Sequence, residues 1–268
     1  AFVYFITPNR IDTSQPVLDG WRYVGGWKRM SFPYPDVIYN RLTSRKYERL
    51  SQVQDLFNIV KKRQQGHIFN EKFLNKSEVF QALAKEPTLK RYLPATNTFQ
   101  SYQTLKTMCA RFPTVFLKPI TGSLGKGIIK VTRHTNASFT CHFSSVNGTR
   151  KVSYPSLSKL YRAISRKMKV QRYQIQQGLN LITNHGRPID FRALVQKSLQ
   201  GEWKVTSIVA RIAGSEHFVS NLARGGQLST VKAAIAKSKL SPSRKKNAGI
   251  ALKKAALMIA HGIETHVP

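Results

Sequence analysis

Residues that could bind phosphate are concentrated in one stretch, Gly122-Ser-Leu-Gly-Lys-Gly127. Glycine lets backbone N–H groups close over phosphate oxygens without a clash from a Cβ atom. Within and before this stretch, Ser123 offers a hydroxyl, Lys126 a mobile positive charge, and Lys118 a second cation on the preceding segment. These residue types favour phosphate binding, although the same pattern also fits an ordinary hairpin with two surface lysines.

The spacing of Gly122, Gly125 and Gly127 differs from the well-known phosphate loops. Only two residues separate Gly122 from Gly125, and Gly127 stands where a Walker loop needs serine or threonine. A dinucleotide fingerprint leads from a strand into a helix, whereas apolar, strand-like segments flank this stretch on both sides. The pattern therefore predicts a glycine-rich flap between two strands, and it leaves phosphate binding and a plain hairpin both open.

Two arginines further along the chain could bind the same anion. Arg192 and Arg211 lie on predicted neighbouring strands, and the planar guanidinium fork suits bidentate binding of an oxyanion. Asp190 lies two residues before Arg192 and so on the same strand face. We expect Asp190 either to orient Arg192 or to form an ordinary cross-strand ion pair.

The elements that must position these residues alternate between strand and helix. Residues 1–75 read as a small α/β lobe, since short strands at 2–6, 36–40 and 67–70 surround an amphipathic helix at 45–62. The expected helices that follow are 102–112, 157–168, 229–236 and 244–263. The expected strands are 114–118, 127–132, 138–143, 149–154, 173–177, 191–197 and 204–211, with a turn at Asn147-Gly148.

Composition bounds the class of protein. The chain has 268 residues, 41% of them hydrophobic, which is enough for a sizeable core. The longest apolar run, Ala1 to Ile6, is far shorter than the roughly 20 residues of a membrane span, and no secretory leader is visible. Cys109 and Cys141 have no zinc-ligand spacing around them. We therefore expect reduced thiols and a cytoplasmic protein without a membrane span.

The charge of the chain is strongly positive. Lysine and arginine number 44 against 12 acidic residues, a net charge of +32, and no carboxylate occurs between Glu86 and Asp190. A field of this sign attracts phosphates, nucleic acid and anionic polymers. Three interpretations stay open: a solvated basic surface, a large polyanionic partner, and a basic substrate cleft.

An ordered set of segments carries a family resemblance. The segments are Pro35–Arg41, Val115–Pro119, Gly122–Ile128, Gln176–Gly178, Asp190–Lys197, Arg211 and Asn221–Gly226. No single segment is specific, but their order resembles the ATP-grasp superfamily, and more narrowly its YheC/YheD-like family of endospore coat-associated proteins. The resemblance implies an α/β (α+β) ATP-grasp fold. Its expected parts are an N-terminal lobe at 1–75, a central subdomain with the flap at 76–175, and a C-terminal subdomain at 176–268 that clamps ATP.

The resemblance also assigns roles to individual residues. The residues implied to bind the nucleotide are Lys118 on its strand, the flap residues Gly122, Ser123, Gly125, Lys126 and Gly127, the adenine hinge Gln176 and Gln177, and Arg224. The residues implied to be catalytic are Arg192 and Arg211, facing the γ-phosphate and an acyl-phosphate, and Asn221 near the acceptor. From the residues alone, the two glutamines could equally be polar strand-end residues, and Asn221 to Arg224 a polar turn before Gly225-Gly226.

The expected cofactors are ATP and Mg²⁺. The superfamily holds magnesium near the C-terminus on an acidic residue followed by a Glu-x-Asn element, because Mg²⁺ prefers hard oxygen ligands. After Asn221 the only carboxylate is Glu264, and the chain ends at Pro268 without that element. We therefore assign no metal ligand, and we expect either that the C-terminal strands are truncated or that metal binding is lost.

Two functions from different classes remain. The resemblance implies an ATP-dependent ligase that activates a carboxylate as an acyl-phosphate for attack by an amine or thiol, with positioning and charge neutralisation as the catalytic means. The partners would be ATP, an unknown carboxylate and an unknown amine, in the cytoplasm or at the spore coat. The alternative is a non-catalytic basic scaffold that binds an anionic polymer of the spore surface or nucleic acid, although few aromatic residues are interleaved with the basic stretches.

Overall fold

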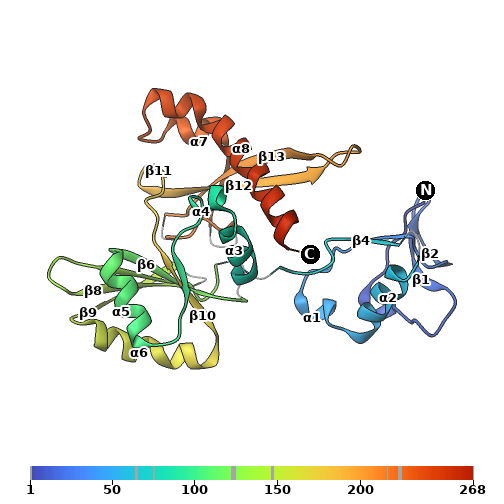
Figure 1. Cartoon of the computed structure of the whole chain (residues 1–268), viewed down its shortest axis with the longest axis horizontal. Coiled ribbons are helices and arrows are strands. Elements are labelled where there is room, and N and C mark those ends of the chain that lie inside the picture. The colour runs from blue at the N-terminus through green and yellow to red at the C-terminus, as the bar shows by residue number, and fades with distance from the viewer. Residues whose placement is uncertain are drawn as a thin grey trace. The chain divides into compact units, whose positions relative to one another are not determined.

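The computed structural model describes residues 2–63, 66–74, 76–121, 125–145, 148–215, 217–222 and 225–267. The chain forms two compact units, residues 1–74 and 75–268 (Figure 1). Among the helices of the described residues, none has the length and apolar character needed to cross a bilayer.

The first unit combines a hairpin with a small parallel sheet. Its elements are η1 (Pro8–Arg10), β1 (Leu18–Tyr23), β2 (Trp27–Phe32), β3 (Val37–Tyr39), α1 (Arg45–Glu48), α2 (Ser51–Lys61) and β4 (His67–Phe69). Strands β1 and β2 pair antiparallel, whereas β3 and β4 pair parallel and are joined by the two helices. The predicted strand at 2–6 is wrong, because Phe5 alone pairs, through an isolated bridge to Trp21.

Helix α2 supplies the core of this unit. Its apolar residues recur at the helical spacing and are buried: Val53, Leu56, Phe57 and Val60. Leu56 and Val60 pack with Leu18 of β1, and the side chains of Ile38 and Ile68 from the parallel strands lie against the same cluster. The lobe thus has a hydrophobic core of its own.

The second unit contains two sheets. Its first group of elements is α3 (Lys76–Ala84), α4 (Pro87–Lys90), β5 (Thr96–Thr98), α5 (Tyr102–Arg111), β6 (Thr114–Pro119), β7 (Ile129–Arg133), β8 (Phe139–Ser145), β9 (Gly148–Tyr154), α6 (Leu157–Val170) and β10 (Tyr173–Gln177). The strands form an antiparallel six-stranded sheet in the order β5-β10-β6-β7-β8-β9. The pairing of β8 with β9 confirms the predicted hairpin, whose residues 146–147 lie outside the described residues.

One face of the six-stranded sheet is apolar and is covered by α5 and α6 (Figure 1). The buried cluster contains Leu105, Met108, Leu160 and Ile164 from these helices, packed on alternate residues of the strands. Those strand residues are Val115, Leu117, Ile129, Val131, Cys141, Tyr173 and Ile175. Because neighbouring residues of a strand point to opposite faces, the residues between them must lie on the other face.

The remaining elements form a four-stranded antiparallel sheet with two helices. They are β11 (Thr183–Asn184), β12 (Arg187–Lys197), β13 (Trp203–Ile212), β14 (Gln227–Thr230), α7 (Val231–Ala236) and α8 (Pro242–His266). The prediction of a helix over 229–236 is wrong at its start, since Ser229 and Thr230 belong to β14. The hydroxyl of Thr230 accepts a hydrogen bond from the backbone N–H of Ala233 at 3.1 Å and caps α7.

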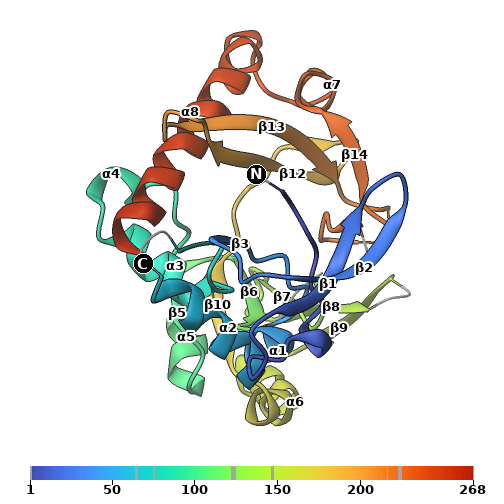
Figure 2. The same ribbon diagram turned by 90° about the vertical axis from the view of Figure 1, so that its right-hand side faces the viewer.

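Helix α8 runs along β12 and β13 (Figures 1 and 2). At its C-terminal end, Glu264 accepts a hydrogen bond from Trp203 Nε1 at 2.7 Å and pairs with Lys197. His266 Nε2 lies 2.7 Å from Glu86 Oε1, and Gly262 packs against Leu89 and Leu83 of the short helices α4 and α3. The helix thereby joins the four-stranded sheet to the start of the unit.

Strand β9 forms one outer edge of the six-stranded sheet. Arg150 and Lys151 in the middle of this strand are exposed. Arg150 also lies over the ring of Phe143 on the neighbouring strand, 4.8 Å from its centroid. The edge is therefore lined by cationic side chains.

Candidate functional site

The face of the six-stranded sheet opposite α5 and α6 is polar. Residues that are direct cross-strand partners form one continuous row across this face. From β5 to β9, the row contains Thr96, Gln176, Phe116, Lys130, His142 and Lys151. A second row alongside contains Thr98, Gln174 and Lys118, and at its far end Ser144 opposite Thr149. We call these two rows the polar face. It presents three lysines, two glutamines and one histidine at the centre of a folded unit.

Lys118 and Gln176, both predicted to bind the nucleotide, meet on the polar face. The ammonium of Lys118 donates a hydrogen bond to Gln176 Oε1, and it also lies over the ring of Phe116 at 5.4 Å from the centroid. Gln176 Nε2 in turn donates to Thr96 Oγ1 at 2.9 Å, and the Gln176 side chain is buried. This chain of contacts holds the lysine in a fixed direction.

Several buried polar atoms of the polar face have no hydrogen-bond partner. Among the described residues, five buried side-chain atoms are unpaired: His142 Nδ1, Ser144 Oγ, Thr149 Oγ1, Gln174 Oε1 and His217 Nδ1. Four of them belong to the polar face, and the fifth belongs to the loop that follows β13. An unpaired buried polar group costs about 1–3 kcal/mol. Their occurrence on one face of the sheet makes that face a candidate surface for a polar ligand.

The electrostatics of the polar face favour an anion. Burial lowers the pKa of His142, and the neighbouring charges of Lys130 and Lys151 lower it further. A histidine with a lowered pKa is neutral at pH 7 and can accept or donate one hydrogen bond. A bound anion between the two lysines would relieve their mutual repulsion.

The described part of the flap adopts the backbone expected of a glycine-rich turn. Gly125 and Gly127 both have φ of +71°, in the left-handed region that favours glycine. The phenolic hydroxyl of Tyr173 donates to the carbonyl of Gly127 at 3.2 Å. Lys126 between the two glycines is exposed. The flap thus leaves the sheet at a point fixed by Tyr173.

A loop from the other sheet covers part of the polar face. Phe218 lies over Phe116 and His142, with ring centroids 6.1 and 6.2 Å apart respectively. A Cβ atom built on Gly125 would lie 2.9 Å from Asn221 Oδ1, so the flap and this predicted site residue are in contact. The loop therefore brings Asn221 to the flap.

The structure pairs Asp190 with Arg211. Arg211 donates two hydrogen bonds to the Asp190 carboxylate, from Nε at 2.7 Å and from Nη2 at 2.8 Å. Ser220 Oγ donates to the same carboxylate, and hydrogen bonding to Asp190 raises the pKa of Arg211. The expectation that Asp190 orients Arg192 is wrong. Arg211 lies directly opposite Asp190 on β13, and it is closer to Asp190 than Arg192 is, two residues further along β12.

The other predicted residues are placed as follows. Arg192 shares the β12 face of Asp190, is exposed, and has no hydrogen bond or ion pair within the described residues. Gln177 lies on the opposite face from Gln176, and its Oε1 accepts a hydrogen bond from the backbone N–H of Ala95 at 3.2 Å. Gly122, Ser123 and Arg224 lie outside the described residues. The roles predicted for all of these residues therefore stay predictions.

Sequence reasoning missed several residues of this site. Lys130, His142 and Lys151 are direct cross-strand neighbours on the polar face, and Phe218 and Ser220 come from the covering loop. The alternation of polar and apolar residues in β7, β8 and β9 was a signal for the first three. Nothing local in the sequence indicated the packing of Phe218 on the sheet.

The described residues provide no cluster of metal ligands. Within that part of the chain, no group of three or more histidine, cysteine, aspartate or glutamate side chains lies together. Asp190, the carboxylate at the site, is already engaged by Arg211 and Ser220. The side chains of the described residues therefore do not form a magnesium site.

Comparison with known proteins identifies several relatives. The family described as YheC/D like ATP-grasp matches residues 65–268. The chain is 27% identical over 268 residues to endospore coat-associated protein YheD of Bacillus subtilis (strain 168). The aligned region covers 100% of this chain and 58% of YheD. It is 22% identical over 205 residues to endospore coat-associated protein YheC of the same organism. This aligned region covers 76% of this chain and 56% of YheC. The chain thus spans a little over half the length of these curated relatives.

A solved structure also aligns with the chain. It is D-alanyl-alanine synthetase A from Vibrio cholerae O1 biovar eltor str. N16961, with 10% identity and a TM-score of 0.42, covering 99% of this chain and 65% of that one. The family match covers most of the chain, including the flap, the polar face and the covering loop. The predicted resemblance and the predicted fold class are confirmed, and the chain belongs to the YheC/D-like ATP-grasp family.

Proposed function

We propose that this chain binds ATP on the polar face and acts as an ATP-dependent ligase that joins a carboxylate to an amine or thiol. The observation that supports this most directly is the group of four unpaired buried polar atoms on that face. Each of them can exchange its missing hydrogen bond for one to a ligand, which turns a cost of folding into binding energy. The ATP-grasp family of the chain supports the choice of ATP.

The residues of the polar face fit the parts of a nucleotide. Lys118 and Lys130 can neutralise phosphate oxygens, and Gly125 lies where the flap can place backbone N–H groups over them. Gln174 and Gln176 offer amide groups of the kind that recognise an adenine edge. Phe116 lies between Gln176 and Lys130 in the first row, and its ring provides an apolar surface.

The proposed reaction requires charge neutralisation at two steps. A carboxylate oxygen of the substrate attacks the γ-phosphorus as the bond to ADP breaks, and the acyl-phosphate forms. The amine or thiol then attacks the acyl carbon and inorganic phosphate leaves. Arg192 is the arginine we assign to the phosphoryl oxygens, since it is exposed on the same strand face as the Asp190–Arg211 pair. Arg211, fixed by Asp190, contributes a charge that cannot swing away.

Asn221 is the residue we assign to the acceptor side. It contacts the flap at Gly125 and lies next to Ser220, which is bonded to Asp190. An amide at this position can both donate to and accept from a substrate. It would hold the acceptor beside the activated carboxylate, and proximity of this kind supplies a large share of the rate in bimolecular reactions.

The names of both curated relatives include endospore coat-associated. We extend this association to the present chain and propose that it acts at the spore coat. Its net charge of +32 would favour contact with anionic material there.

Titration with ATP tests the nucleotide site. The chain should be stabilised against thermal unfolding by ATP with Mg²⁺, and Lys118→Ala should lose about 10-fold or more in ATP affinity, because it removes a charge-assisted hydrogen bond worth about 1.5–3 kcal/mol. Lys106→Ala is the matched control, since Lys106 is an exposed lysine on α5, a helix that covers the opposite face of the same sheet. Equal ATP affinity in the Lys118 variant and the wild type would refute the site.

Release of ADP tests the ligase activity. We expect ADP formation that depends on both a carboxylate and an amine or thiol from a panel of small metabolites. Arg192→Ala should lower the rate with little change in ATP affinity, because its charge acts on the transferred phosphoryl group. ATP binding without such ADP formation across the panel would reduce the proposal to a nucleotide-binding protein.

A further inference from the structure

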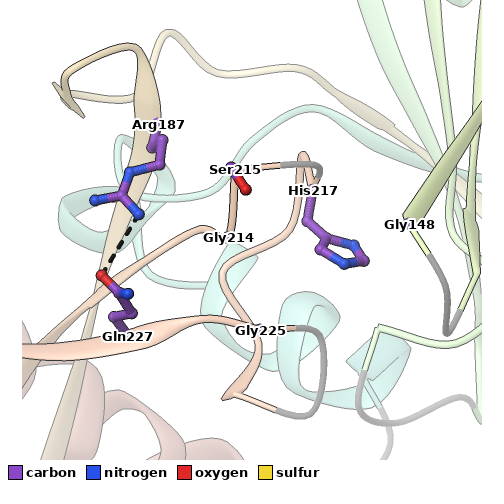
Figure 3. Close-up of a pocket in the computed structure, with 7 residues that line it drawn as sticks. All are labelled: Gly148, Arg187, Gly214, Ser215, His217, Gly225 and Gln227. Atoms are coloured by element: carbon purple, nitrogen blue, oxygen red, sulfur yellow. Dashed lines mark hydrogen bonds between the residues drawn. The ribbon is translucent and has the colours of Figure 1, made fainter.

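A pocket lies beside the polar face. It has a volume of about 340 Å³ and is lined by Gly148, Arg187, Gly214, Ser215, His217, Gly225 and Gln227 (Figure 3). Among these residues only Gly225 belongs to the segment Asn221–Gly226 that the family resemblance places at the site. Its volume lies at the lower end of the range for small-molecule sites, roughly 300–1,000 Å³. The pocket is therefore of a size for a small metabolite.

The fold builds this pocket from the meeting point of the two sheets. Arg187 begins β12, Gly214 follows the end of β13, and Gln227 begins β14, so all three lie at one end of the four-stranded sheet. Gly148 begins β9 of the other sheet. Figure 3 shows Arg187 and Gln227 facing each other on one side and His217 on the side toward Gly148. The lining residues therefore come from regular elements as well as from the loop.

The described residues that line the pocket carry a net positive charge. Arg187 is the permanent charge among its described lining residues, and none of those residues carries a carboxylate. Arg187 Nη1 donates to Gln227 Oε1 over 3.4 Å, which is long for a hydrogen bond. This contact orients the guanidinium, and its remaining N–H groups have no partner within the described residues. Gln227 keeps its own amide donors.

His217 adds a further hydrogen-bonding group. Its Nδ1 is buried and has no partner in the described structure. The ring carbon next to Nε2 lies 3.9 Å from the position of a Cβ atom at Gly225, another lining residue. The ring edge that contains Nε2 therefore lies toward Gly225.

We propose that this pocket binds a carboxylate group of a small-molecule substrate. The proposal rests on the ligase function above and names a binding site for its carboxylic acid substrate. The planar fork of Arg187 matches the two oxygens of a carboxylate, with His217 and Gln227 as further donors. The described lining residues carry one permanent positive charge, which balances one carboxylate group.

Calorimetric titration of the full chain with succinate, without nucleotide, tests the proposal. We expect succinate to bind and its neutral diamide, succinamide, and inorganic phosphate to bind at least 10-fold more weakly. Arg187→Ala should weaken succinate binding by about 10- to 100-fold, the loss expected for hydrogen bonds to a charged group. Arg187→Lys should recover only part of the loss, because lysine keeps the charge but not the fork.

Arg162→Ala is the charge-matched control, since Arg162 is exposed on α6 and removes the same charge away from the pocket. Succinate affinity should not change in this variant. Equal losses in the Arg162 and Arg187 variants would overturn the proposal, because they would reflect the general charge of the chain. Tighter binding of phosphate than of succinate, or no succinate binding, would also overturn it.

The titration separates this proposal from the ligase function. If ATP affinity is unaffected by Lys118→Ala but succinate binds through Arg187, the result supports the carboxylate pocket and refutes the nucleotide site. If ATP binds through Lys118 and succinate does not bind, the result supports the nucleotide site and refutes the carboxylate pocket.

Discussion

Two glycines in helix α8 predict opposite effects of the same substitution. A Cβ atom added at Gly249 would meet nothing within 4 Å, whereas one added at Gly262 would lie 2.3 Å from Leu89 Cδ1 and 3.2 Å from Leu83 Cδ2. In both cases alanine gains about 1 kcal/mol of helix propensity over glycine. Leu89 is buried, so it cannot move aside without disturbing its neighbours.

The magnitudes decide the sign for each variant. Gly249→Ala should raise the free energy of unfolding by about 0.5–1 kcal/mol. Gly262→Ala gains the same amount but loses about 1–3 kcal/mol to overpacking. The propensity gain cancels when the two variants are compared, so the difference between them, about 1–3 kcal/mol, isolates the packing of α8 on α3 and α4.

Urea unfolding followed by tryptophan fluorescence measures this difference. Trp203 of β13 contacts Glu264 on α8. In a background in which Trp21 and Trp27 are changed to phenylalanine, the fluorescence therefore reports on the surroundings of Trp203, which include the end of this helix. A Gly262→Ala protein as stable as the Gly249→Ala protein would refute the reasoning, because it would mean that α8 does not pack closely on Leu89.

Two further predictions concern titratable groups. Hydrogen bonds from Lys197 and Trp203 lower the pKa of Glu264 below its ordinary value of 4.5, so the carboxylate stabilises the fold above pH 4.5 and this contribution disappears as the pH falls through the lowered pKa. The melting temperatures of wild type and Glu264→Gln should therefore differ at pH 7 and converge toward pH 3; a constant difference would contradict this. Burial raises the pKa of both Cys109 and Cys141 to about 12, so neither thiol of the folded chain should react with Ellman's reagent at pH 8, and both should react in denaturant. Rapid reaction of the folded chain would contradict this.

Much of the fold could be predicted because the sequence patterns are local. The spacing of Val53, Leu56 and Val60 predicted α2, and the alternation around Leu117 and Ile175 predicted buried strands of the central sheet. The failures occurred where tertiary context decides. Residues 2–6 have strand-like composition but find a partner only at Phe5.

The site could be predicted only in part for a similar reason. Lys118 and Gln176 are far apart in sequence, and only the family resemblance predicted that both belong to one site. The sequence left two alternatives for Asp190, an orienting role for Arg192 and a cross-strand ion pair, because spacing shows which residues share a face but not which residue lies opposite. Pairing register, which joins Asp190 to Arg211, depends on the whole β12–β13 hairpin.

The cationic edge of β9 has a consequence for how the protein behaves at high concentration. An exposed edge strand is a template for pairing with a second copy, and natural proteins prevent this with charge, especially lysine. Here Arg150 and Lys151 occupy the middle of the edge, so two copies aligned edge to edge would bring like charges together. In 1 M salt the Debye length falls to about 3 Å, and the repulsion between the copies is largely screened. Self-association through this strand is therefore held off by electrostatics, and the solubility of the chain should depend on keeping the ionic strength low.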